Sequence, residues 1–308
     1  MRTVLLSNDP VRLNFLAALL RDAGIETVLL DSHVSSVEGS IGAIPRRLAV
    51  LPEDEAQARR VLQEAGEVVE TTDGTLLGGR VLYRQPARGH RTGIEPVFLA
   101  AAVPACPGDR VLEAGLGAGA GLLCLAARVP ALLGTGIELD PDTAALARCN
   151  LRDNGLPDWP VLEMDVLMLR MPGTFTHAFA NPPWHDPTGT PSPDRRRLLA
   201  KRDGGAGLEG WASALADAVQ PGGTVTLVIP GASAARALRA LHDAGCGGLV
   251  MAPLWPKHGR DARLVIVRGS KGSRTPDRVA PGLVLHHDDG RFTTDADAVL
   301  RDGGPLRL

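Results

Sequence analysis

The fold of this chain is decided by Val111-Leu112-Glu113-Ala114-Gly115-Leu116-Gly117-Ala118-Gly119. An apolar run leads into three glycines at alternate positions, and a helical pattern follows over 119–129. Because glycine tolerates positive φ and lets a ligand approach the backbone closely, we predict a strand, a glycine turn and a helix at a nucleotide-like ligand. The spacing G-x-G-x-G differs from the G-x-G-x-x-G of dinucleotide-binding folds, so the turn alone does not specify the ligand.

Two acidic residues follow the next two apolar runs. Glu138 ends the run over 134–139, and Asp165 follows the run over 161–164. In open α/β sheets, ligands lie beyond the carboxyl ends of the strands. We therefore expect Glu138 to accept hydrogen bonds from ribose hydroxyls and Asp165 to accept one from an adenine amino group. For either acid taken singly, a helix cap or a solvated loop is the alternative interpretation.

Strand-like and helical patterns alternate through the rest of the chain. The expected strands are 111–112, 134–139, 161–164, 177–180, 224–229 and 264–267, and the expected helices are 119–129, 141–153, 209–219 and 232–244. This alternation predicts an α/β fold with a largely parallel sheet covered on both faces. A terminal hairpin over 284–292 is expected to turn at Asp289-Gly290.

Residues 1–68 are expected to form a separate small domain, ahead of a second domain over 71–308. The order is strand, helix, strand, strand, helix, with strands at 3–6, 25–30 and 47–51, the first helix opening at Asp9-Pro10, and the second running from Pro52 to Gly66. This order predicts an α+β, half ferredoxin-like sheet. The segment resembles the small prokaryotic signal-transducing domain that is compared with PII regulators. Sensing, RNA binding and dimer contact all stay open as its role.

The chemistry is indicated by Phe179-Ala180-Asn181-Pro182-Pro183-Trp184, which follows the fourth apolar strand. The Asn181 side-chain oxygen and the Pro182 carbonyl are expected to accept the two hydrogens of an NH2 group. Pro183 stiffens the loop, and Trp184 offers a flat face for a base or an amide plane. Two such acceptors localise the nitrogen lone pair, so no strong general base is required. An ordinary Asn-Pro turn is the alternative interpretation.

From about residue 71 the chain resembles the bacterial tRNA(Val) adenine-N6 methyltransferase family. The resemblance extends to Leu77-Gly78-Gly79-Arg80 and to 85–91, and later to 253–257, 268–272 and 283–293. It implies a class I Rossmann-like methyltransferase with a mostly parallel seven-stranded sheet and S-adenosylmethionine as cofactor. Two departures are Glu95, where the family usually has Asp, and Trp184, where it usually has Tyr.

The resemblance also implies the residues of the site. Segment 85–91 would line the methionine end of the cofactor. The catalytic group would be Asn181, Pro182, Pro183 and Trp184. The cofactor-binding group would be Gln85, Arg91, Glu113, Gly115, Gly117, Gly119, Glu138, Asp165 and Asn181.

An RNA substrate is implied as well. The net charge of −2 excludes a polycation, so RNA contact requires local basic patches. The expected contacts are Arg195, Arg196, Arg197, Lys201 and Lys257, with His258, Arg260 and Arg263 near the last. Because the chain is rich in arginine, solvated helix faces are the alternative interpretation of both patches.

Four other functions compete: a protein glutamine-N5 methyltransferase, a DNA adenine methyltransferase, a guanine-N2 enzyme, and a non-catalytic regulator that retains the cofactor fold. No apolar run approaches the length of a membrane span, and the four cysteines suggest neither a metal site nor a disulfide framework. We therefore expect a cytoplasmic protein with no metal and no membrane contact, and the oligomeric state stays open.

Overall fold

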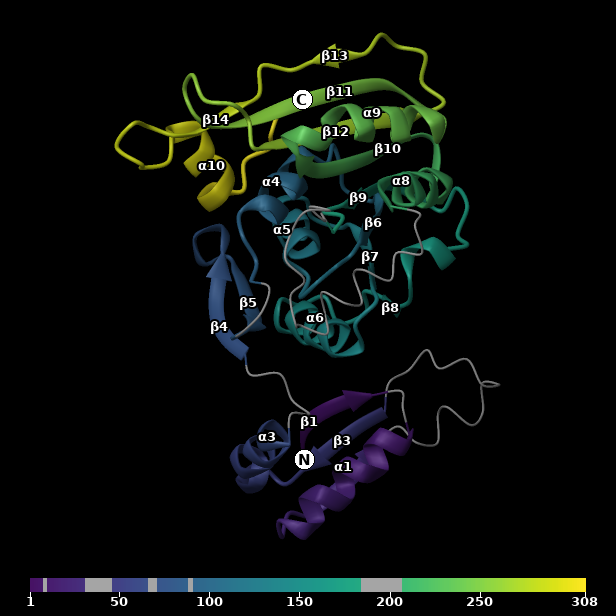
Figure 1. Cartoon of the computed structure of the whole chain (residues 1–308). Coiled ribbons are helices and arrows are strands. Elements are labelled where there is room, and N and C mark those ends of the chain that lie inside the picture. The colour runs from purple at the N-terminus through teal and green to yellow at the C-terminus, as the bar shows by residue number, and fades with distance from the viewer. Residues whose placement is uncertain (8–9, 31–45, 66–70, 88–90, 184–206) are drawn as a thin grey trace. The chain divides into compact units, whose positions relative to one another are not determined.

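The computed structural model describes residues 1–7, 10–30, 46–65, 71–87, 91–183 and 207–308. The chain divides into two compact units (Figure 1). One unit is Met1–Thr72 with Pro86–Arg88, and the other is Asp73–Gln85 with Gly89–Leu308.

The first unit has the predicted half ferredoxin-like arrangement. Its elements are β1 (Arg2–Ser7), α1 (Pro10–Asp22), β2 (Thr27–Leu30), β3 (Arg46–Val50), η1 (Pro52–Asp54) and α3 (Glu55–Glu64). Strand β3 pairs antiparallel with both β1 and β2. Helix α1 buries Leu13, Leu16 and Leu20 against Leu48 and Val50. The expected N-cap Asp9 lies outside the described residues.

Strand β2 begins two residues later than predicted, and the end of α1 explains the difference. Gly24 has φ +78°, and the Ile25 N–H donates to the Leu20 carbonyl at 2.9 Å. Ile25 thus belongs to the helix terminus, where its side chain is buried.

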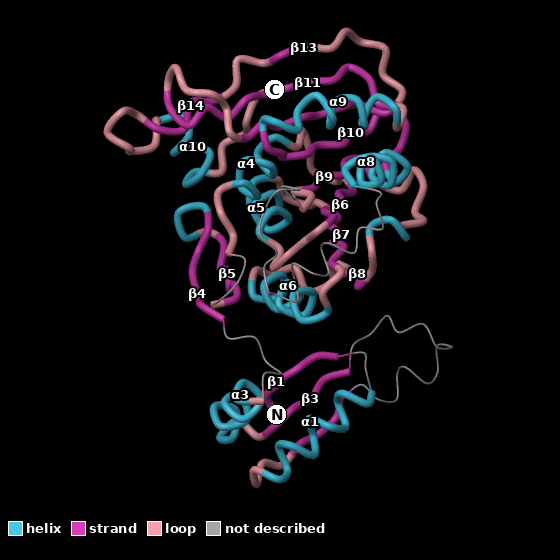
Figure 2. The backbone as a smooth tube through the Cα atoms, viewed as in Figure 1, coloured by secondary structure: helices cyan, strands magenta, loops and turns pink. Residues whose placement is uncertain are grey.

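The second unit is built on a large sheet (Figure 2). Seven strands follow the order β11-β12-β10-β9-β6-β7-β8. They are β6 (Arg110–Ala114), β7 (Leu133–Glu138), β8 (Val161–Glu163), β9 (Phe175–Ala180), β10 (Val219–Pro230), β11 (Cys246–Lys257) and β12 (Leu264–Lys271). Pairing is parallel from β8 to β10, whereas β12 pairs antiparallel with β10 and β11. The predicted mostly parallel sheet is confirmed, and β13 (Arg278–Val279) and β14 (Leu283–His286) extend it beyond β11.

Helices cover both faces of this sheet. They are α4 (Glu95–Ala102), α5 (Ala120–Arg128), α6 (Pro141–Asp153), α8 (Gly207–Ala218), α9 (Ala234–Asp243) and α10 (Thr294–Asp302). Successive strand residues point to opposite faces, so Val111 packs in the cluster with α4, α5 and α6, and Leu112 in the cluster with α8 and α9. None of the helices in the described ranges has the length and apolar character for a bilayer crossing.

Several elements, α10 and β11 among them, were not predicted from the sequence. The β11 sequence contains Gly247-Gly248, Pro253 and Pro256, and glycine and proline are unfavourable inside strands. The hairpin of β4 (Thr71–Leu76) and β5 (Val81–Pro86) forms its own two-stranded sheet, joined by η2 (Leu77–Gly79). The expected turn at Asp289-Gly290 is present, with Gly290 at φ +87°, but the returning segment forms only a bridge between His286 and Phe292.

Candidate functional site

The glycine turn, Glu138, Asp165 and Asn181 lie at one edge of the large sheet. In the strand register, Ala114 aligns with Ile137 on one side and with Ala180 on the other. Each of the four features begins where its parallel strand ends. We call this the carboxyl edge, and it is where ligands of open α/β sheets bind.

The glycine turn is fastened to the end of β7. The Leu116 N–H donates to the Ile137 carbonyl at 2.8 Å, and the Gly117 N–H donates to Glu138 Oε2 at 2.8 Å. Gly115, Gly117 and Gly119 have φ of +67°, +56° and +93°, a region that favours glycine. Apart from Gly117 itself and its two chain neighbours, no described residue has an atom within 4 Å of the position a Gly117 Cβ would take. Within the described structure, the backbone at Gly117 therefore faces open space, as a bound cofactor requires.

Trp211 on α8 is a residue of the site that the sequence analysis missed. A Cβ on Gly115 would lie 3.0 Å from Trp211 Cη2, and the Trp211 side chain is buried. The indole thus packs directly on the first glycine and fixes the course of the turn. The scarcity of tryptophan, four in 308 residues, was the available signal.

Glu113 is buried beneath the turn. Its Oε2 accepts a hydrogen bond from the Leu122 N–H at 2.6 Å, in the first turn of α5. Burial raises the pKa of Glu113 to about 8, although the Leu122 N–H opposes this shift. These contacts make Glu113 a group that ties the turn to α5, and its direct contact with the cofactor stays a prediction.

Glu138 and Asp165 each hold local backbone. Glu138 Oε1 accepts from the Asp140 N–H at 2.9 Å, and burial raises the Glu138 pKa while the Asp140 and Gly117 N–H groups oppose the shift. Asp165 caps η3 (Val166–Met168) by accepting from the Leu167 N–H at 2.9 Å. A carboxylate accepts about four hydrogen bonds, so both side chains retain capacity for hydroxyl or amino donors.

The Asn181 loop follows β9 directly. Asn181 is half-buried, Pro182 is buried and Pro183 is exposed. No other described residue makes a hydrogen bond to the Asn181 side chain, whose amide is therefore not committed to the described fold. Outside the described residues lie Trp184, Arg195, Arg196, Arg197 and Lys201.

The segment around Gln85 joins the same region. Gln85 Oε1 accepts from the Thr92 N–H at 3.1 Å, and the Thr92 hydroxyl lies 2.6 Å from the Tyr83 hydroxyl. Burial raises the pKa of Tyr83 to about 12, and the Glu113 carboxylate adds to the shift. Tyr83 is buried in the same apolar cluster as Leu116 and Ala118 of the glycine turn. Arg91 is exposed and directly precedes Thr92.

Lys257 ends β11 at the carboxyl edge, because Leu254 aligns with Leu264 and Leu264 with Pro230. Strand β11 is three strands from β9, roughly 14 Å at the usual strand spacing. The Lys257 ammonium donates to the Asp288 carbonyl at 2.8 Å. Nearby, His258, Arg260 and Arg263 are exposed. This cationic group lies on the same edge as Asn181.

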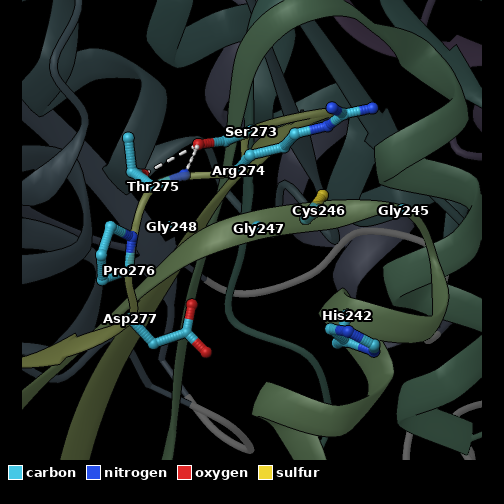
Figure 3. A pocket seen from close by; sticks show the side chains of 10 residues that line it. All are labelled: His242, Gly245, Cys246, Gly247, Gly248, Ser273, Arg274, Thr275, Pro276 and Asp277. Atoms are coloured by element: carbon cyan, nitrogen blue, oxygen red, sulfur yellow. Dashed lines mark hydrogen bonds between the residues drawn. The ribbon is translucent and has the colours of Figure 1, made fainter.

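A cavity among the described residues lies away from the carboxyl edge. A pocket of about 430 Å³ at the start of β11 is lined by Gly245–Gly248 and the loop Ser273–Asp277 (Figure 3). Strand register puts Cys246 beside Lys271 and Ser270 beside Thr224, at the opposite, amino edge of the sheet. This cavity is separate from the glycine turn. Among the described residues, no cluster of three or more His, Cys, Asp or Glu side chains could hold a metal ion.

Comparisons with known proteins match different parts of the chain. A family model described as "Putative prokaryotic signal transducing protein" matches residues 1–66. Two relatives are each named tRNA1(Val) (adenine(37)-N6)-methyltransferase. The one from Aeromonas hydrophila is 26% identical over 204 residues, which cover 66% of this chain and 85% of the relative. The one from Bacteroides thetaiotaomicron is 29% identical over 142 residues, covering 46% and 60%.

A solved structure from Agrobacterium tumefaciens, named a "predicted O-methyltransferase", superimposes with a TM-score of 0.58 at 25% identity. It covers 69% of this chain and 98% of its own. The resemblances predicted for both parts of the chain are thus confirmed.

Proposed function

We propose that this protein, an S-adenosylmethionine-dependent methyltransferase, methylates the exocyclic amino nitrogen of an adenine in tRNA. The enzyme class and cofactor follow from the methyltransferase fold and from the names of the relatives and the solved structure. The choice of an amino group as methyl acceptor rests on the position of Asn181-Pro182-Pro183. This segment follows β9 directly, at the edge that holds the glycine turn.

The described residues fit this cofactor. Where a nucleoside would approach Gly117, no described residue beyond its chain neighbours stands in the way, and the Glu138 carboxylate beside it has lone pairs left for ribose hydroxyls. Asp165 follows the next strand of the sheet, where it would accept a hydrogen bond from the amino group of the cofactor's adenine. The bound cofactor would supply an electrophilic methyl group.

The Asn181 loop would then orient the acceptor. An adenine amino group has two hydrogens, and the Asn181 Oδ1 and the Pro182 carbonyl would each accept one. Pulled away from the ring plane, the nitrogen keeps less of its lone pair in resonance and directs it toward the methyl group. The catalysis assigned to these residues is positioning and electrostatics, which needs no ionised base. A hydroxyl group as methyl acceptor has a single hydrogen, so it would form a hydrogen bond to only one of the two oxygens.

Basic side chains at the carboxyl edge support a nucleic-acid substrate. Lys257, His258, Arg260 and Arg263 share the edge with Asn181, where they would hold phosphates while the base enters the site. Arg195, Arg196, Arg197 and Lys201 follow the loop in sequence and are proposed for the same role, with Trp184 stacking on the base.

The test is methyl transfer from tritiated cofactor to total tRNA, total DNA and release-factor protein in parallel. We expect label in tRNA, recovered as N6-methyladenosine after nucleoside analysis. Label in the protein pool would replace the proposal by glutamine methylation, because a glutamine amide presents the same two hydrogens. Label in N2-methylguanosine or in DNA would reject the adenine or the RNA, and cofactor binding without any transfer would support a regulator.

A further inference from the structure

We infer that Asn150, in the last turn of α6, is a positioning residue for the cofactor: it holds strand β5 against the glycine turn. The inference rests on the cofactor site described under the proposed function. No carboxylate, glycine or proline of that site is involved.

The Asn150 side chain is buried and fully engaged. Its Oδ1 accepts from the Arg84 N–H at 3.0 Å, and its Nδ2 donates to the Arg84 carbonyl and to the Ala118 carbonyl, both at 2.8 Å. Only 1% of the residue is exposed. One amide thus connects a strand that lies 66 residues away to the glycine turn itself.

Asn154, one helical turn further on, repeats half of this pattern. Its Oδ1 accepts from the Leu82 N–H at 2.9 Å, and its Nδ2 donates to the Leu82 carbonyl at 2.7 Å. It makes no bond to the glycine turn; its other donor bond goes to the Asn150 carbonyl at 2.7 Å. Asn154 therefore holds β5 to α6 without touching the cofactor site.

The spacing of the two asparagines matches the strand. Residues at i and i+4 of a helix are about 6 Å apart, close to the roughly 6.6 Å between alternate residues of a strand. Leu82 and Arg84 are alternate residues of β5, so their N–H and C=O groups point to the same side. Strand β4 pairs with β5 on one side, and the two side-chain amides act as the partner on the other.

Helix α6 thereby joins three parts of the site. Asp140 caps its start and donates its N–H to Glu138, Asn150 holds the turn at Ala118, and β5 contains Gln85 next to its last residue. Glu138 and Gln85 are predicted to hold the ribose and the methionine ends of the cofactor. Their separation is set by this helix, and Asn150 is its contact with both the turn and the strand.

The experiment measures S-adenosylhomocysteine binding by isothermal titration to the full-length protein. The variants are Asn150→Asp, which keeps the shape but replaces the two N–H donors by a carboxylate facing two carbonyls, Asn150→Ala, and the matched control Asn154→Ala. Glu138→Ala is the positive control. Hydrogen exchange at the Leu82 and Arg84 amides reports whether their hydrogen bonds to Asn154 and Asn150 are lost. The unfolding temperature of ligand-free protein reports stability.

We expect Asn150→Asp and Asn150→Ala to raise the dissociation constant about tenfold or more, because buried partners lose their bonds and the turn is no longer fixed to β5. Arg84 loses exchange protection in both. Asn154→Ala should expose the Leu82 amide yet change the dissociation constant by less than about threefold. In turnover, the KM for the cofactor should rise while kcat at saturation stays within about threefold.

Binding by folded Asn150→Asp within twofold of wild type, with the Arg84 amide exposed, would overturn the inference. Equal weakening by Asn154→Ala would overturn the role of the Ala118 contact. A variant that only unfolds at lower temperature, with unchanged affinity below it, would make Asn150 purely structural. Failure of the wild-type protein to bind S-adenosylhomocysteine would reject the cofactor site instead, and transfer to an acceptor other than tRNA would reject the proposed substrate while leaving the Asn150 result standing.

Discussion

The two edges of the large sheet both carry glycines with positive φ, and they use them differently. Gly117 at the carboxyl edge has φ +56°, and Gly248 at the amino edge has φ +57°. No described residue beyond its chain neighbours occupies the space in front of Gly117, whereas a Cβ on Gly248 would collide with the Thr275 and Ser273 hydroxyls. The first glycine leaves room for something outside the chain, and the second lets the chain pack on itself. Glycine content alone therefore does not identify a ligand site. The site is identified by whether the space in front of each glycine is open or filled by the chain.

The acidic residues also have different roles at the two edges of the sheet. At the amino edge, the exposed Asp277 accepts from the Leu249 N–H at 2.8 Å and closes a β-bulge. At the carboxyl edge, Glu113 and Glu138 are desolvated. Glu138 accepts from Gly117 in the glycine turn, and Glu113, just before the turn, accepts from Leu122 in α5, just after it. A turn held this firmly, with open space on its outer side, is preorganised for a ligand. Among the described residues that line the amino-edge pocket, no buried carboxylate holds a glycine turn in this way.

The largest effect is expected at the carboxyl edge for Asn181→Ala. Loss of one preorganised acceptor should lower the rate of methyl transfer by about 10² to 10³. The dissociation constant for S-adenosylhomocysteine should stay within about threefold, because Asn181 acts on the acceptor amino group. Single-turnover methyl transfer and titration on the same preparation check both values. A variant with near wild-type turnover would remove Asn181 from the reaction.

The second test uses the buried carboxyl under the turn. The pKa of Glu113 is raised from 4.5 to about 8, so between these values the folded protein retains a proton that the unfolded chain releases. Stability from this group is full below pH 4.5 and is lost as the pH rises toward 8, by about 3 kcal/mol between pH 5 and 8. Glu113→Gln should flatten that decline. Urea unfolding of ligand-free protein at both pH values measures it, and parallel pH profiles for variant and wild type would contradict the assignment.

The glycine comparison itself is tested by Gly117→Ala and Gly248→Ala, a pair matched in φ. Each should lose about 1 kcal/mol of stability from the positive φ. Gly248→Ala should lose about 1 kcal/mol more by displacing Thr275 and Ser273, while cofactor affinity is unchanged. Gly117→Ala should weaken S-adenosylhomocysteine binding severalfold, because the new methyl group fills the space of the ligand. Equal affinity in the two variants would erase the distinction between the edges.

Much of this site follows from the sequence because its groups are local to strand ends. The apolar runs before Gly115, Glu138 and Asn181 predict parallel strands, and parallel strands bring their carboxyl ends together. What the sequence did not predict depends on contacts between distant segments. Asn150 was one polar residue in a helical pattern until Arg84 and Ala118 were found at its amide, 66 and 32 residues away. Trp211 likewise acquires its meaning only from Gly115 beneath it. The sequence pattern predicts the helices and strands, whereas the roles of Asn150 and Trp211 depend on contacts between segments that are distant in the sequence.

The smallest expected effect concerns the substrate and compares one positively charged side chain at each edge: the half-buried Lys257 and the exposed Arg274. Lys257 ends β11 at the carboxyl edge, and the exposed Arg274 belongs to the loop of the amino-edge pocket. If RNA lies along the carboxyl edge, Lys257→Ser should lower tRNA affinity a few-fold and reduce the slope of log K against log salt by about 1, the value of one phosphate contact. Arg274→Ser should leave the slope unchanged. Because both variants remove one positive charge, a general electrostatic effect would alter the two alike, and only a local contact separates them. Filter binding at several salt concentrations measures the slopes. A reduced slope for Arg274→Ser would mean that the RNA reaches the amino edge, and the polar pocket there would then belong to the substrate surface.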